Sequence, residues 1–353
     1  MTEQEKPAKN LHRLVLTGIW LAIFVIGLGA YTRLTHAGLG CPDWPGCYGL
    51  IDVPQTSQQI AAAEKAFPER PFEAEKAWNE MIHRYFAGAL GILIAIIAFL
   101  SIKLRLSNTT NIKYPLILPL IILALVTFQA ALGMWTVTLK LMPIIVMAHL
   151  LGGFSTLCLL FLLHLRIKHH SKNNQKTSST IGQSKKYSRL SLLGVVILTA
   201  QIALGGWTSS NYAAMSCIEL PICQGDWFSN LTFNNSFDII PPDRDSYEFG
   251  HLEHNERVTI HVTHRLGAIV TAIFITWLAT IVFLKARTLV IKRTAIILFS
   301  LLVIQLALGV SNIWFSLPLN IAVAHNLVAA FLMLSLITLT YKLRQNPEEV
   351  VNE

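Results

Sequence analysis

The sequence predicts an all-α membrane protein with eight transmembrane helices, arranged as two tandem four-helix bundles. Its composition, its eight long apolar runs and an internal repeat lead to this fold class. Hydrophobic residues make up 53% of the 353 residues, charged residues make up 14%, and the mean hydropathy is +0.51. These values exclude a soluble α/β enzyme, a disordered chain and a coiled coil. The net charge of +8 comes from basic residues scattered in short gaps between apolar runs, so we expect no nucleic-acid binding.

The apolar runs are each long enough to cross a lipid bilayer as a helix. They cover approximately residues 14–34, 81–104, 114–139, 143–167, 188–213, 257–284, 293–316 and 319–341. The first run follows Lys6, Lys9 and Arg13, as the core of a signal peptide would. Because this run is too long for a signal peptide and no small-residue cleavage site follows it, we expect a retained helix.

The basic residues predict the orientation in the membrane, since Lys and Arg are retained on the cytoplasmic side. The two chain ends and the connections near 105, 166–189 and 285–293 hold 19 of the 28 basic residues. We therefore expect both termini in the cytoplasm. The two long segments that this topology places outside, 35–80 and 214–256, hold 15 of the 20 acidic residues.

The chain matches itself at an offset of 176 residues, which indicates a duplicated unit. The matches are Gly29-Ala30-Tyr31-Thr32 with Gly205-Gly206-Trp207-Thr208, Cys41 with Cys217, Cys47 with Cys223, Gln129 with Gln305, Gly133 with Gly309, and His149 with His325. His83-Arg84 matches His264-Arg265 at an offset of 181. We expect an N-terminal half over 1–170, a basic cytoplasmic linker over 171–187 and a C-terminal half over 188–353. Since each half has an even number of helices, the halves should be related by a pseudo-two-fold axis along the membrane normal.

Four histidines fall at corresponding places in the second, fourth, sixth and eighth predicted helices: His83, His149, His264 and His325. All four helices begin at the outer face in this topology, so these side chains lie at similar depth. Pairs of neutral imidazoles at one depth are typical of bis-histidine ligation of haem iron. The alternative is that each histidine only forms a hydrogen bond with a neighbouring helix.

Four cysteines form two equivalent pairs in the outer segments, Cys41 with Cys47 and Cys217 with Cys223. The outer side is oxidising, so disulfides are expected, and of three possible connectivities we favour pairing within each loop. Such a disulfide could be a structural staple or a redox-active pair. A zinc site is less favoured because the paired Cys-x-x-Cys spacing is missing.

The two halves differ chemically next to their histidines. Glu80 stands one helical turn before His83, whereas the residue one turn before His264 is His261. A carboxylate there could bind a proton or orient the imidazole, or it could be a solvated residue at the end of the helix. Arg33 is matched only by Ser209 and could contact a haem propionate or anchor the helix at the interface.

Over nearly its whole length the chain resembles the haem A synthases of bacterial and mitochondrial membranes. The motifs that carry the resemblance are GAYTRLT at 29–35, CPDWPGC at 41–47, EMIHR at 80–84 and AHN at 324–326. The resemblance implies a membrane oxidoreductase that converts the ring methyl of haem O to a formyl group by successive hydroxylations. It also implies that His264 and His325 bind a resident haem b, and that His83, His149 and Glu80 line the site of the substrate haem.

The same resemblance implies a haem O synthase as donor and a terminal oxidase as the receiver of haem A. The start of the chain is not rich in Arg and Ser, so a bacterial inner membrane is expected. The acidic 226–256 stretch has no counterpart in these motifs.

Two other functions share part of this pattern. A dihaem b-type electron carrier or quinone-linked cytochrome subunit would use the same four histidines, and a secondary transporter would share the repeat without needing the histidines. Glu80 beside only one of the histidine pairs favours the enzyme.

Overall fold

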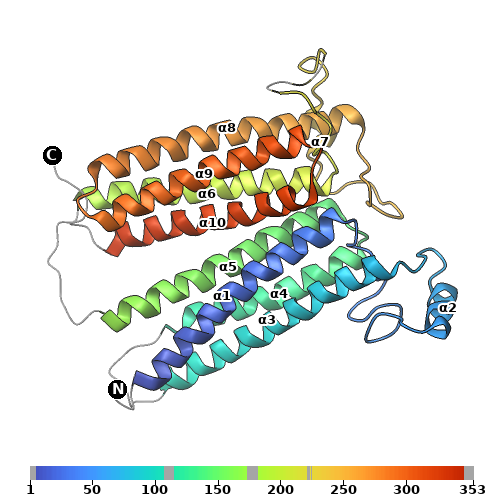
Figure 1. The fold of residues 1–353 in the computed structure, drawn as a ribbon, viewed down its shortest axis with the longest axis horizontal. Helices are drawn as coiled ribbons and strands as arrows, with labels where there is room; N and C mark the ends of the chain where they lie inside the picture. Colours follow the sequence, from blue (N-terminus) through green and yellow to red (C-terminus); the bar gives the residue numbers. More distant parts are fainter. Residues whose placement is uncertain (1–4, 107–114, 173–181, 221–222, 224, 346–353) are drawn as a thin grey trace. The chain divides into compact units, whose positions relative to one another are not determined.

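The computed structural model describes residues 5–106, 115–172, 182–220, 223 and 225–345, and the regular elements in this part of the chain are helices (Figure 1). Eight of these helices are long and apolar enough to span a membrane. They are α1 (Glu5–Leu34), α3 (Ala74–Leu106), α4 (Ile117–Thr138), α5 (Pro143–Lys172), α6 (Gly182–Ser210), α8 (His254–Lys285), α9 (Leu289–Trp314) and α10 (Leu319–Gln345). The all-α fold class and the eight predicted spans are confirmed, and the chain is a multi-pass membrane protein.

Two short helices in the outer segments were not predicted, α2 (Ser57–Ala66) and α7 (Phe233–Ser236). At the start of α2, the Thr56 side chain accepts from the backbone N–H of Gln59, and the Gln59 side chain accepts from the backbone N–H of Thr56. This capping box was visible in the sequence as Thr-x-x-Gln.

The chain divides into two compact units. In the first, α3 contacts α1 and α4, and α5 approaches α1 where Leu160 lies beside Gly18. In the second, α6 contacts α8, α8 contacts α9, α9 contacts α10, and α10 contacts α6. Each unit therefore contains four of the spanning helices, while the pseudo-two-fold relation between the units stays a prediction. Of the expected linker 171–187, residues 173–181 lie outside the described part of the chain.

The spanning helices keep large apolar faces that the protein does not bury. Within the most hydrophobic window of each helix, only 22–44% of residues are buried. Trp20, Ile92, Phe99 and Ile273 are each about two-thirds exposed. Such faces suit lipid, because the backbone polar groups of a helix are already hydrogen-bonded within it.

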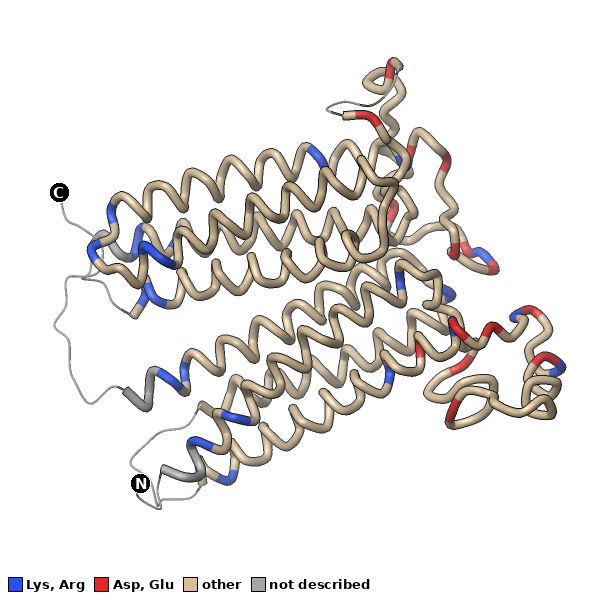
Figure 2. Tube along the Cα trace, in the orientation of Figure 1, with Lys and Arg blue, Asp and Glu red and all other residues tan. Residues whose placement is uncertain are grey.

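Charged residues separate along each bundle. Figure 2 shows that, in each unit, Lys and Arg gather at one end of the helices, whereas most Asp and Glu lie in the loops at the opposite end. This separation is what the predicted topology requires, with the basic ends in the cytoplasm.

One segment belongs to a different unit from the half in which the sequence places it. Residues Asp238–His251 lie between α6 and α8 in sequence but belong to the first unit. The backbone N–H of Tyr247 donates to the Lys140 carbonyl at 3.0 Å, and Glu248 pairs with Arg70 at 2.7 Å. Part of the acidic stretch that matched no motif therefore covers the end of the first bundle that the predicted topology places outside. We call residues 238–251 the strap.

Candidate functional site

The first unit brings together two of the predicted histidines. His83 on α3 and His149 on α5 have ring centroids 6.5 Å apart, with their planes at 82°. The helices that carry them are separated in sequence by α4. The sequence placed both imidazoles at one depth, and the fold makes them neighbours.

The second unit surrounds its histidines with glutamine amides. Nε2 of Gln201 lies 3.0 Å from Nδ1 of His264 and donates to the His264 carbonyl, also at 3.0 Å. Nε2 of Gln305 lies 3.2 Å from Nε2 of His325. In the sequence, Gln305 stands out only as a repeat of Gln129, and nothing marks Gln201, whose counterpart in the first half is Val25. These hydrogen bonds orient the imidazole rings.

Each of the four imidazoles packs against a glycine of a neighbouring helix. A Cβ atom added to Gly29 or Gly205 would lie 3.0 or 3.1 Å from Cε1 of His83 or His264. The same atom on Gly133 or Gly309 would lie 3.4 or 3.3 Å from Cε1 of His149 or His325. A side chain larger than hydrogen would crowd the ring at Gly29, Gly205 and Gly309, and would be in direct contact with it at Gly133. The four glycines are thus part of the sites, and their shared offset of 176 was the sequence signal for this role.

The residues fit haem iron. Metal-to-imidazole bonds are about 2 Å long, so two imidazoles on opposite sides of one metal have centroids about 6 Å apart, close to the His83–His149 spacing. Nδ1 of His83, His149 and His325 is buried, and the three imidazoles interact with the backbone of Val25, Gln129 and Gln305 respectively. For His325, ligation through Nε2 would replace its contact with Gln305. The described residues contain no cluster of three or more His, Cys, Asp or Glu suited to a metal ion.

Glu80 is buried, with 5% of its surface exposed, and lies one turn before His83 on α3. Its Oε1 pairs with the Arg84 guanidinium, and its Oε2 accepts from the backbone N–H of Cys41 at 2.9 Å. The alternative of a solvated residue at the helix end is therefore wrong. The equivalent His261 in the second unit is buried as well, with 4% exposed.

The cysteines pair within their loops, Cys41 with Cys47 and Cys217 with Cys223, as favoured from the sequence. Each disulfide is buried in a small apolar cluster at the start of a spanning helix. The first packs with Tyr48, Ala77 and Met81, and the second with Val258 and Val262. Thiol exchange requires access to a sulfur atom, so this burial favours the staple over the redox pair.

Arg33 lies in the last turn of α1 and is half-buried. This position agrees with both roles expected from the sequence. Its contact with a haem propionate stays a prediction.

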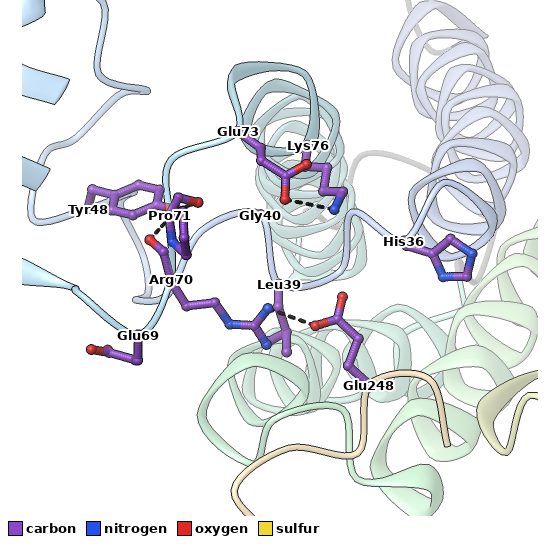
Figure 3. Close-up of a pocket in the computed structure, with 10 residues that line it drawn as sticks. All are labelled: His36, Leu39, Gly40, Tyr48, Glu69, Arg70, Pro71, Glu73, Lys76 and Glu248. Carbon is purple, nitrogen blue, oxygen red and sulfur yellow. Dashed lines mark hydrogen bonds and ion pairs between the residues drawn. The ribbon is translucent and has the colours of Figure 1, made fainter. Parts of the chain in front are cut away.

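A polar pocket of about 70 Å³ lies at the outer end of the first unit, beside the strap (Figure 3). Arg70, His36, Lys76 and Glu248 are among its lining residues, and Figure 3 shows Glu248 directed at Arg70. Burial, followed by the nearby Arg33 charge, lowers the pKa of His36. The pocket holds a few water molecules at most and is far too small for a porphyrin.

Comparison with known proteins shows the family of this chain. The family model of COX15-CtaA, described as cytochrome oxidase assembly protein, matches residues 12–337. A protein of Shewanella oneidensis named heme A synthase is 48% identical over 319 residues, covering 90% of this chain and 92% of its own length. Proteins of the same name from Ehrlichia ruminantium and Chelativorans sp. are 27% and 26% identical and cover 93% and 89% of this chain, and 93% and 87% of their own lengths. Both the match of the family model and the identity to the Shewanella protein span nearly the whole chain, so this protein belongs to the COX15-CtaA family of cytochrome oxidase assembly proteins.

Proposed function

We propose that this chain is a haem A synthase, which oxidises the ring methyl of haem O to a formyl group by successive hydroxylations. The observation that carries the proposal is the neighbouring pair His83 and His149 in the unit where Glu80 is buried one turn from His83. The 48% identity to a protein named heme A synthase supports the same activity.

In this proposal the two units have different tasks. His83 and His149 hold the iron of the substrate haem, and His264 and His325 hold a resident haem b. The resident haem would supply one-electron redox chemistry when bound. In the second unit, the Gln201 amide contacts Nδ1 of His264, a ring nitrogen that ligation through Nε2 leaves in place, whereas the imidazoles of the first unit have no glutamine side-chain contact among the described residues.

Glu80 is the group proposed to act in the reaction. Oxidising a methyl group removes electrons and releases protons. A carboxylate close to the substituent stabilises developing positive charge and accepts a proton. In the second unit His261 stands in this place, so that unit lacks the carboxylate. This difference also argues against a dihaem electron carrier, whose two sites could be alike.

The proposed setting is a bacterial inner membrane with both termini in the cytoplasm. A haem O synthase would deliver the substrate, and the assembly of a terminal oxidase would use the haem A that is made. The family description, cytochrome oxidase assembly protein, supports the second of these partners.

The test is Glu80→Gln, with His261→Gln as the matched change in the second unit. Gln keeps the size and hydrogen bonding of Glu80 but removes the charge, so conversion should fall by about a hundredfold or more. Haem O or a partly oxidised haem should accumulate in pigment extracts, while the haem b spectrum remains. His261→Gln should affect conversion less. Wild-type formation of haem A by Glu80→Gln, together with its loss in His261→Gln, would reverse the tasks of the two units.

A further inference from the structure

Arg84 joins Glu80 to the first disulfide loop, which we define as residues 41–47. One guanidinium nitrogen, Nη2, pairs with Glu80, and the other, Nη1, donates to the carbonyls of Gly46 at 2.6 Å and Asp43 at 3.0 Å. The exposed fractions of the Arg84 and Glu80 side chains are only 13% and 6%. A single side chain therefore connects α3, the carboxylate and the loop in a place with little water.

Both oxygens of Glu80 are held by hydrogen bonds. Oε1 meets Arg84, and Oε2 accepts from the N–H of Cys41, which is itself in the disulfide. A carboxylate with both oxygens bound has a fixed orientation, and each oxygen retains a lone pair. The position of Glu80 thus depends on the loop.

The loop in turn has a defined shape. Asp43 accepts from the backbone N–H groups of Tyr48 and Gly49, each at 2.7 Å. A Cβ atom on Gly46 would lie 1.9 Å from the Leu50 carbonyl oxygen, so the chain requires glycine there. The Gly46 and Asp43 carbonyls are therefore in place to receive Arg84.

In the second unit an arginine also donates to carbonyls of a disulfide loop, but no carboxylate pairs with it. Arg265 donates to the carbonyls of Cys217 at 2.5 Å and Glu219 at 2.9 Å. The residue in the place of Glu80 is His261, which offers no negative charge for an ion pair. Holding a disulfide loop is therefore a task that both arginines share, whereas pairing a carboxylate belongs to Arg84 alone.

We propose that Arg84 is a positioning residue of the reaction, which holds the Glu80 carboxylate in a fixed orientation between α3 and the disulfide loop. This inference rests on the proposed function and deepens it. An unpaired carboxylate in a buried site is unstable, whereas a charge-assisted pair with further hydrogen bonds stabilises the charged form. Glu80 then acts through the arrangement that Arg84 maintains.

The test compares Arg84→Gln, Arg84→Lys, Glu80→Gln and the double variant Arg84→Gln with Glu80→Gln, with Arg265→Gln as the matched control. The ratio of haem A to haem O in pigment extracts measures conversion, and the haem b spectrum reports folding. Access of the cysteines to a maleimide reagent after graded reduction with dithiothreitol reports how tightly each loop is held.

Arg84→Gln should lower conversion about as much as Glu80→Gln, and the double variant should be no worse than the lower of the two, because both changes remove one interacting unit. Conversion by Arg84→Lys should lie between that of Arg84→Gln and that of the wild type, since Lys keeps the positive charge but lacks the two guanidinium nitrogens that donate to Glu80 and to the loop. Arg265→Gln should open its own loop to the maleimide yet keep conversion within about twofold of the wild type.

Three results would overturn the inference. The losses from Arg84→Gln and Glu80→Gln could multiply in the double variant, or Arg265→Gln could lower conversion as much as Arg84→Gln. If Arg84→Gln lacks the haem b spectrum, and so does not fold, Arg84→Lys is measured in its place. Conversion by Arg84→Lys at the wild-type level would then be the third result that overturns the inference. Normal conversion by the single variant Glu80→Gln would refute the role proposed for Glu80. This outcome distinguishes a failure of the proposed function from a failure of the inference about Arg84.

Discussion

At the scale of single residues, the four histidines differ from ordinary interhelical contacts in what surrounds them. Each has a glycine beside the ring, and His83 and His149 have a spacing that fits one metal between them. These features favour ligation over helix packing.

Replacing His264 or His325 by Ala should remove the proposed resident haem b. A six-coordinate iron would lose one of two protein ligands, so haem occupancy should fall at least about tenfold. The reduced-minus-oxidised spectrum and the haem content of purified protein measure this. His254→Ala, an exposed change in the first turn of α8, is the control that should keep the haem. Haem b at the wild-type level in both ligand variants would refute the assignment.

At the scale of elements, the strap shows how a loop of one half in sequence becomes part of the other unit in space. Tyr247 is buried and its hydroxyl donates to the Pro242 carbonyl at 2.9 Å, which closes the strap on itself. Glu248, only 10% exposed, then reaches Arg70. The strap is therefore attached by a backbone hydrogen bond and an ion pair at the outer end of the first bundle.

Glu248→Gln should loosen the strap. A partly buried ion pair of this kind contributes about 1 kcal/mol, or roughly fivefold in the population of the detached segment. Trypsin acts on locally unfolded chain, so cleavage after the exposed Arg244 should be faster by a similar factor, as measured by gel electrophoresis of purified protein. Glu73→Gln removes the more exposed pair with Lys76 and should leave the rate unchanged. Equal rates in Glu248→Gln and the wild type would show that the ion pair does not hold the strap.

At the scale of the whole molecule, eight spans with an uneven distribution of charge predict one topology. The basic ends of both bundles, the buried disulfides and the acidic loops agree with one another only if the disulfide loops face the oxidising side. The expected sides of the membrane can be measured directly.

A reporter fused after Ser179, which lies outside the described residues, should be cytoplasmic, and one fused near Asp243 should be external. Alkaline phosphatase is active only outside and a fluorescent protein folds inside, so the pair gives opposite signals at the two places. A fusion after the C-terminal Glu353 is the control and should report as Ser179 does. A cytoplasmic signal at Asp243 would overturn the topology and, with it, the expected oxidation of the cysteines.

The sequence by itself determined the eight spans, their division into halves, the expected orientation and the four histidines at matched positions. These are properties of local hydropathy, of charge in short connections and of a constant offset along the chain. They need no knowledge of which segments meet, since a bilayer imposes the same length and polarity on every spanning helix.

The tertiary structure decided which groups touch. It brought His83 to within 6.5 Å of His149, selected the local disulfides among three connectivities, joined Glu80 and Arg84 to the first disulfide loop, and placed Glu248 against Arg70, 178 residues away. It also attached the strap to the first unit, where the repeat alone would have left it in the second. The physical reason is that such contacts depend on side-chain packing between segments far apart in the chain, and no local pattern of residues specifies that packing.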